Sequence, residues 1–300
     1  MTRSTAVDTF SLAYIDTLPS GTSTTVPADV VLLHGWPGDA SDYRDVSPLL
    51  ADKHRLVIPD LRGFGESDRW AVDPDRYYSP SAQASSVASL ITELGLHRPV
   101  VAGYDIGSRI AQTLAKEHPD LVGALALSPP LPGAGARVVA QESVPELWYQ
   151  YFHRSPLSVP MLDGHRDAVH AYLKHFWSHW SGPNFEVMTP DFEALVDRYS
   201  RHGAFQATTN WYRVGGGYVG NALTEKAPDK SARIQIPTHV LWQELDPLFP
   251  RAWSDRLDEF FADVTLHWVD GVGHFTPLEA PEAFARLIET AIADVGVNKN

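Results

Sequence analysis

The chain has 300 residues, 44% of them hydrophobic, which suffices for one large α/β domain with room for an inserted lobe. It contains no cysteine, which excludes disulfides, thiolate chemistry and cysteine-rich zinc sites. Its formal net charge of −13 disfavours nucleic acid or an anionic membrane as a partner.

The amino-terminal segment, residues 1–18, has no apolar stretch long enough for a signal peptide, and no apolar run elsewhere could span a membrane. We therefore expect a cytoplasmic protein that does not act at a membrane. The composition leaves the oligomeric state open, with a homodimer as one option.

Short apolar runs alternate with helical patterns in the first part of the chain, which is typical of a doubly wound, mostly parallel sheet. Strands are expected over residues 10–18, 30–33, 55–59, 100–103 and 124–127, and helices over residues 81–94 and 108–118.

This alternation stops between residues 132 and 230, where no strand is evident and helical patterns cover residues 167–180 and 190–199. It resumes with a strand at 238–242, an element at 251–261, a strand at 265–269 and a last helix at 281–295. We therefore expect a core made of residues 1–131 and 231–300. A helical cap, residues 132–230, would lie over the edge where open α/β sheets bind ligands.

Residues 103–107, Gly-Tyr-Asp-Ile-Gly, have the spacing of the G-x-S-x-G nucleophile elbow, a turn between strand and helix that exposes one side chain. That residue is Asp105. A serine would need a histidine to remove its proton, whereas an ionised carboxylate can attack carbon directly. The elbow therefore predicts an enzyme that opens a strained ether or displaces a halide through an alkyl ester, and it argues against an ordinary esterase.

The segment His34-Gly-Trp-Pro-Gly38 follows the expected strand at 30–33. In enzymes with such an elbow, an amide N–H of the corresponding loop acts together with the amide N–H of the residue after the nucleophile. Both donate hydrogen bonds to an oxyanion and stabilise it. These amides would belong to Trp36 and Ile106.

His274, in the segment Gly-Val-Gly-His-Phe after the last strand, can take a proton from water. Asp246 follows the preceding strand and is the candidate to orient this imidazole, with Glu244 as the nearest rival. The segment after residues 124–127 is Ser128-Pro-Pro and offers no carboxylate. The order Asp105, Asp246, His274 is that of nucleophile, acid and base.

Together these motifs resemble the epoxide hydrolase branch of the α/β-hydrolase superfamily over nearly the whole chain. The segments Asp60-Leu-Arg-Gly-Phe-Gly-Glu-Ser and Phe275-Thr-Pro-Leu-Glu are also similar to family sequence. The resemblance implies the α/β-hydrolase fold and a small apolar epoxide that is converted into a vicinal diol. It implies no cofactor and no metal.

In such enzymes two cap acids, usually tyrosines, donate hydrogen bonds to the epoxide oxygen. The string Asn210-Trp-Tyr-Arg resembles the usual context of the second, which would be Tyr212. The first would lie in the aromatic run Leu-Trp-Tyr-Gln-Tyr-Phe-His, where Tyr149 fits best and Tyr151 and His153 remain alternatives. Trp148, Trp177, Trp180 and Trp211 of the cap suggest an apolar pocket that could accept an aryl group.

Dehalogenases that use the same aspartate are the main alternative. Haloalkane dehalogenases usually carry a tryptophan directly after the nucleophile, where this chain has Ile106. Fluoroacetate dehalogenases resemble Asp-Arg-Gly-x-Arg, of which this chain keeps only Arg109, a residue better suited to a structural ion pair. A third hypothesis, ligand binding without turnover, would leave the nucleophile, acid and base without a purpose. His175 and His179 lack the glutamate of a zincin helix, so a metal site is not expected there.

Overall fold

The computed structural model describes residues 1–19, 28–215 and 217–297. Its strands form one eight-stranded sheet in the order β1-β2-β4-β3-β5-β6-β7-β8. Strand β2 runs antiparallel to both of its neighbours, and the remaining pairs are parallel. The strands are β1 (Thr2–Arg3), β2 (Ala13–Thr17), β3 (Asp29–Leu33), β4 (Arg55–Pro59), β5 (Val100–Gly103), β6 (Ala124–Leu127), β7 (Thr238–Gln243) and β8 (Val264–Val269).

The helices fall into two groups. Those of the core are η1 (Ala40–Tyr43), α1 (Ser47–Leu50), α2 (Pro74–Tyr77), α3 (Pro80–Glu93), α4 (Ile106–Glu117), η2 (Pro119–Leu121), η5 (Arg251–Glu259), α11 (Thr276–Glu279) and α12 (Pro281–Val297). Those between β6 and β7 are η3 (Gly135–Val139), α5 (Trp148–Arg154), α6 (Ser158–Leu162), α7 (Arg166–Trp180), α8 (Pro190–Tyr199), α9 (Ala204–Arg213), α10 (Gly217–Thr224) and η4 (Lys230–Ala232).

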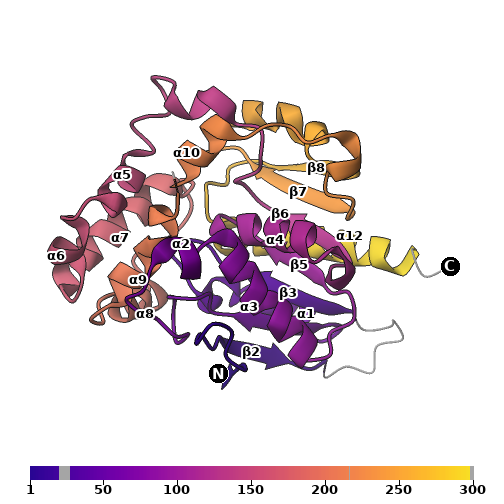
Figure 1. The fold of residues 1–300 in the computed structure, drawn as a ribbon, viewed down its shortest axis with the longest axis horizontal. Coiled ribbons are helices and arrows are strands. Elements are labelled where there is room, and N and C mark those ends of the chain that lie inside the picture. The colour runs from indigo at the N-terminus through magenta and orange to yellow at the C-terminus, as the bar shows by residue number, and fades with distance from the viewer. Residues whose placement is uncertain (20–27, 216, 298–300) are drawn as a thin grey trace.

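Helices cover both faces of the central strands, which explains why these strands are apolar throughout. The residues of β5 and β6 are all buried. Helix α4 packs on β3, β5 and β6 and is itself covered by α3, whereas α12 packs on β5, β6 and β7 from the other side (Figure 1). The predicted doubly wound α/β architecture is therefore confirmed.

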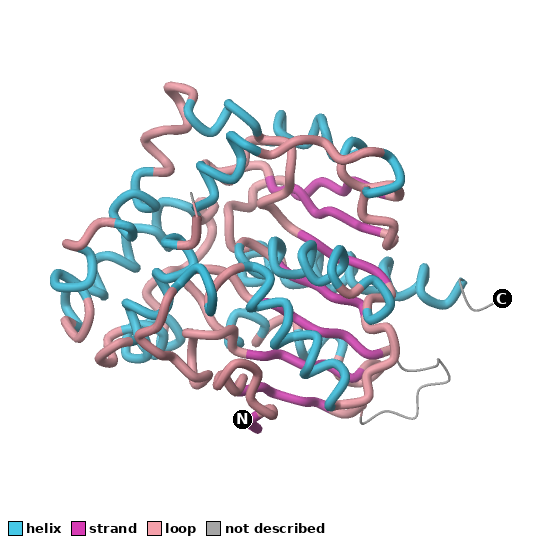
Figure 2. The backbone as a smooth tube through the Cα atoms, viewed as in Figure 1, coloured by secondary structure: helices cyan, strands magenta, loops and turns pink. Residues whose placement is uncertain are grey.

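The helices from α5 to α9 gather on one side of the sheet, as Figure 2 shows, and the described residues between β6 and β7 contain no strand. We call the whole segment between β6 and β7 the cap. The predicted division into residues 1–131, 132–230 and 231–300 stays a prediction as to its exact limits. Among the described residues, no helix combines the length and the apolar character needed to cross a membrane.

Several element limits differ from those predicted from the sequence. The strand expected over residues 10–18 begins only at Ala13, because Asp8 and Thr9 have φ angles of +50° and +73° and turn the chain sharply before it. The helix expected from residue 108 already begins at Ile106. The element at 251–261 is the 3-10 helix η5, which is interrupted by non-helical backbone at Arg256.

Candidate active site

Asp105 sits at a strained turn between β5 and α4. Its φ of +49° and ψ of −126° are unusual for any residue except glycine, and such strain is often found where a side chain has a function. Gly107 lets the turn close, because a Cβ there would lie 2.1 Å from the carbonyl oxygen of Leu33 on β3. Asp105 is only 5% exposed. The backbone thus has the form of the predicted elbow, with a buried carboxylate at its tip.

The segment from residue 34 to residue 39, here called the oxyanion loop, lies directly against this carboxylate. The amide N–H of Trp36 donates a hydrogen bond to Asp105 Oδ1 at 2.7 Å. Gly35 makes this approach feasible, because a Cβ there would come within 2.8 Å of the Cβ of Asp105. The amide of Ile106, the second predicted donor, is the first of α4 and therefore has no acceptor within its own helix.

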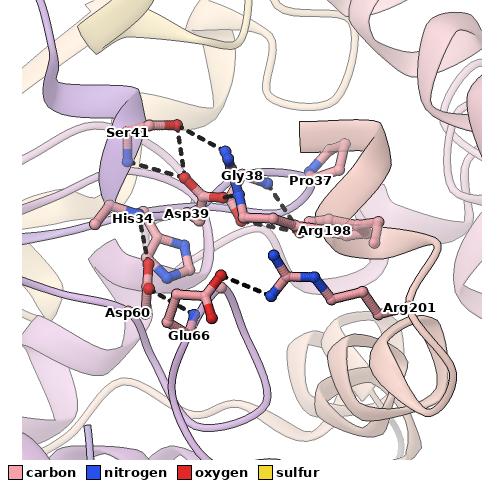
Figure 3. Close-up of polar contacts among 12 residues, drawn as sticks. His34, Pro37, Gly38, Asp39, Ser41, Asp60, Glu66, Arg198 and Arg201 are labelled. Atoms are coloured by element: carbon pink, nitrogen blue, oxygen red, sulfur yellow. Dashed lines mark hydrogen bonds and ion pairs between the residues drawn. The ribbon is translucent and has the colours of Figure 1, made fainter. Parts of the chain in front are cut away.

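The cap holds the oxyanion loop in place. The hydroxyl of Tyr199, at the end of α8, accepts from the N–H of Gly38 at 3.0 Å and donates to its carbonyl at 2.9 Å. The guanidinium of Arg198 donates to the carboxylate of Asp39, as Figure 3 shows. Burial raises the pKa of Asp39, but the charge of Arg198 and the hydrogen bonds from Ser41 together outweigh this effect and bring it below its ordinary value. The loop that donates to Asp105 is thereby held by contacts with both the core and the cap.

His274 lies between two carboxylates. Its Nδ1 is 2.9 Å from Asp246 Oδ2, and its Nε2 is 3.4 Å from Asp105 Oδ2, an ion-pair distance that is longer than a normal hydrogen bond. Glu244, the rival acid, is exposed and accepts instead from the N–H of Gly271 at 2.9 Å. The structure therefore brings together the three residues that the sequence singled out as nucleophile, acid and base.

The two carboxylates control the charge of this imidazole. Burial by itself lowers the pKa of His274, but the charge of Asp246 and the interactions with Asp105 outweigh it and raise the pKa to about 10. His274 is therefore a cation at neutral pH for as long as Asp105 is ionised.

This raised pKa predicts how stability depends on pH. In the unfolded chain the histidine titrates near pH 6.5, so its stabilising effect is complete below that pH and is lost as the pH rises through 10. We expect denaturant unfolding to show that the stability difference between the wild type and His274→Gln shrinks by a few kcal/mol over this range, at about 1.4 kcal/mol for each pH unit. His97→Gln, at an exposed position, serves as the control and should follow the wild type. A constant difference would contradict the assigned charge.

Among the described residues, the tyrosines that line the pocket at Asp105 are Tyr149 of α5, Tyr212 of α9 and Tyr218 of α10. Tyr149 and Tyr212 are the two predicted donors. They are 2% and 3% exposed, and their ring centroids are 5.5 Å apart. Burial, reinforced by nearby charge, raises the pKa of both far above 10, so both hydroxyls stay protonated and can donate. Tyr151, the first alternative to Tyr149, is 61% exposed.

His153, the second alternative, is fully buried behind these two tyrosines. Its Nε2 is 3.0 Å from the hydroxyl of Tyr172, and its ring packs edge-on against Trp36 with centroids 4.7 Å apart. Burial lowers the pKa of His153 well below 6.5, so it is neutral. It does not line the pocket, and a supporting role for Tyr212, whose ring centroid is 4.7 Å from its own, fits its position better.

The pocket wall is mainly apolar. Of the four cap tryptophans only Trp211 lines it, whereas Trp148 is 41% exposed and Trp177 and Trp180 are buried in packing between cap and core. Of the residues that suggested an apolar pocket, one therefore lines it and the others pack in the cap or lie at its surface. The complete lining consists of Pro80, Asp105, Ile106, Arg109, Pro130, Tyr149, Gln150, Trp211, Tyr212, Val214, Gly217, Tyr218, Asn221 and Phe249.

Sequence reasoning missed the residues that support the acid. Gln243 donates to Asp246 Oδ2 at 2.6 Å, and the N–H of Leu248 donates to Asp246 Oδ1 at 2.8 Å. Ser128, at the position without a carboxylate, donates to Gln243 Oε1 at 2.9 Å and accepts from Thr276 at 2.8 Å. A glutamine at the end of a fully buried strand was the signal that could have revealed this network.

Comparisons with known proteins agree with this geometry. A family model described as the alpha/beta hydrolase fold matches residues 30–281. The soluble epoxide hydrolase of Corynebacterium sp. (strain C12) is 28% identical over 274 residues, which cover 88% of each protein. The fluoroacetate dehalogenase of Burkholderia sp. is 35% identical over 278 residues, which cover 88% of this chain and 87% of its own.

Solved structures show the same relationship. The epoxide hydrolase CorEH, solved without ligand, has a TM-score of 0.78 and 25% identity over 99% of both chains. These likenesses confirm the predicted fold and the resemblance to the epoxide hydrolase branch. The chain belongs to the α/β-hydrolase fold family.

Proposed function

We propose that the protein is an epoxide hydrolase that converts an epoxide into a vicinal diol through an ester on Asp105. The observation that carries this proposal is that Asp105, Tyr149 and Tyr212 all line one pocket. A nucleophile and two proton donors at one site match the two needs of epoxide opening, attack at carbon and stabilisation of the oxygen that leaves it.

In the first step, Asp105 Oδ2 attacks the less hindered epoxide carbon and the bond from that carbon to oxygen breaks. Oδ1 stays on the N–H of Trp36 and becomes the carbonyl oxygen of the ester. The epoxide oxygen takes up the negative charge and receives hydrogen bonds, and then a proton, from Tyr149 and Tyr212. Without them an alkoxide would form in a buried pocket at high cost.

In the second step, His274 activates water. Formation of the ester neutralises Asp105 and removes one of the two negative charges that raise the pKa of His274. The pKa therefore falls, and His274 gives up its proton, which restores the tyrosine that protonated the epoxide oxygen. The neutral imidazole, oriented by Asp246, then takes a proton from water. The resulting hydroxide attacks the ester carbonyl, whose oxygen is stabilised by the amides of Trp36 and Ile106. When the intermediate collapses, the bond from the carboxyl carbon to the diol oxygen breaks, and that oxygen takes the proton of the added hydroxyl. The diol is released and the carboxylate of Asp105 is regenerated.

A dehalogenase is the second candidate, because a fluoroacetate dehalogenase is 35% identical to this chain. Two features of the pocket argue against it. Ile106 replaces the first arginine of the dehalogenase motif, and the guanidinium of Arg109 lies 3.5 Å from the carboxylate of Glu225, so its charge is already balanced. Binding without turnover is less well supported, since the complete set Asp105, Asp246 and His274 has no purpose in a receptor.

A small activity panel tests the proposal against these alternatives. Styrene oxide, a short aliphatic epoxide, a 1-haloalkane and fluoroacetate are offered to the enzyme, with diol and halide measured separately. We expect diol from at least one epoxide and no halide release from the other two compounds. Release of halide without diol formation would favour a dehalogenase, and no product of either kind would favour a binding protein.

A further inference from the structure

Two polar atoms in the pocket wall have no hydrogen-bonding partner within the protein. They are Oε1 of Gln150 and the hydroxyl oxygen of Tyr218, both buried, and both residues line the pocket. Gln150 as a whole is only 4% exposed. More than nine-tenths of buried polar groups in proteins are paired, and leaving one unpaired costs about 1–3 kcal/mol. Two such atoms in the wall of one pocket indicate that a bound molecule supplies their partners.

Both atoms belong to the wall formed by α5 and α10. Gln150 Nε2 donates to the hydroxyl of the neighbouring Tyr149 at 3.3 Å, which orients the amide. Its Oε1 lies beside Gly217, where an added Cβ would be 3.5 Å away. Tyr218 follows on α10, and its ring packs edge-on against Phe249 with centroids 5.5 Å apart. The absence of a side chain at Gly217 thus keeps a Cβ away from Gln150 Oε1, which is buried beside the start of α10.

The charges around this wall favour binding of an uncharged group of the ligand. Arg109 also lines the pocket, but it is paired with Glu225 at 3.5 Å, and the carboxylates of Asp105 and Asp246 add negative charge. A carboxylate on the ligand could not donate to Gln150 Oε1 and would be repelled by it. An ammonium could donate but could not accept from Tyr218. A hydroxyl does both.

We propose that the pocket selects epoxides that carry a hydroxyl group on their substituent, bound between Gln150 Oε1 and the hydroxyl of Tyr218. This inference rests on the proposed epoxide hydrolase function and specifies its substrate class. A substrate without the hydroxyl leaves both atoms unpaired in the complex, and a site built to pair a hydroxyl discriminates strongly against an analogue that lacks it. The rest of the wall, including Trp211 and Phe249, accommodates the apolar chain that joins the hydroxyl to the epoxide.

The test compares matched pairs of 1,2-epoxyalkanes and their ω-hydroxy counterparts over a series of chain lengths. For the wild type, we expect kcat/KM to favour the hydroxylated member by about tenfold or more at the chain length that spans the pocket. In Tyr218→Phe this ratio should fall to near one. Tyr151→Phe, which removes an exposed hydroxyl outside the pocket, should retain the wild-type ratio.

The outcomes separate this inference from the function on which it rests. Diol formation with equal kcat/KM for both members of every pair, or a preference that survives in Tyr218→Phe, would overturn the inference and leave the epoxide hydrolase function intact. If no epoxide of either kind is converted, the proposed function fails and the inference fails with it.

Discussion

When His274→Gln is mixed with an epoxide substrate, we expect the protein to gain the mass of one whole epoxide and to stop turning over. In the proposed mechanism His274 acts on water only after the ester has formed, so ring opening continues while hydrolysis of the ester is blocked. Asp105 keeps the hydrogen bond from the N–H of Trp36, which does not depend on the imidazole. Intact-protein mass spectrometry, followed by peptide mapping to Asp105, measures the effect.

Two controls make the His274 experiment decisive. His97→Gln, at an exposed position outside the site, should turn over substrate without accumulating adduct. Asp105→Ala should neither form adduct nor release diol, because it lacks the attacking oxygen. If His274→Gln remains free of adduct while Asp105 is still needed for turnover, another residue is the base.

Replacement of Tyr212 by Phe should slow formation of the ester itself. The substitution removes a buried donor from the oxygen that becomes charged as the epoxide opens, and loss of one such donor costs about 3 kcal/mol, or roughly a hundredfold in rate. The effect is smaller to the extent that Tyr149, whose ring lies 5.5 Å away, compensates. Rapid mixing of excess enzyme with substrate, with adduct formation as the readout, separates this step from hydrolysis.

Tyr151→Phe is the matched control for this substitution. Tyr151 stands two residues after Tyr149 in α5, yet it is 61% exposed, so ester formation should proceed at the wild-type rate. An unchanged rate in Tyr212→Phe would mean that the tyrosine only packs in the cap. The dehalogenase reading would then be the stronger one.

Local sequence signals predicted those parts of the molecule that short segments determine. Helix α8 has the predicted limits because Thr189 caps it through a 3.2 Å hydrogen bond from the N–H of Phe192 and because Pro190 starts it. The elbow was predictable for a similar reason, since Gly103 to Gly107 must turn sharply between a buried strand and a helix. The pattern failed at residues 10–12, because the chain turns at Asp8 and Thr9 and Phe10 forms an isolated bridge with Val7 in place of the expected strand.

Contacts between distant segments could not be predicted from the sequence. Tyr149 and Tyr151 are both aromatic residues on one short helix, and only the fold shows that the first is buried above Asp105 and the second exposed. Likewise, Gln150 and Tyr218 are far apart in the chain, and their unpaired atoms have meaning only because α5 and α10 form one wall. Motif spacing was enough to single out Asp105, Asp246 and His274, whereas the shape of the pocket depends on packing that no motif encodes.

The covalent role of Asp105 is tested most directly by a single turnover in heavy-oxygen water with enzyme in excess over epoxide. If water attacks the ester carbonyl, the label enters the carboxylate of Asp105 and the diol released in that turnover remains unlabelled. Mass spectrometry of the peptide that contains Asp105, together with that of the diol, locates the label. Label in the diol and none in Asp105 would mean that water attacks the epoxide directly, which contradicts the ester mechanism.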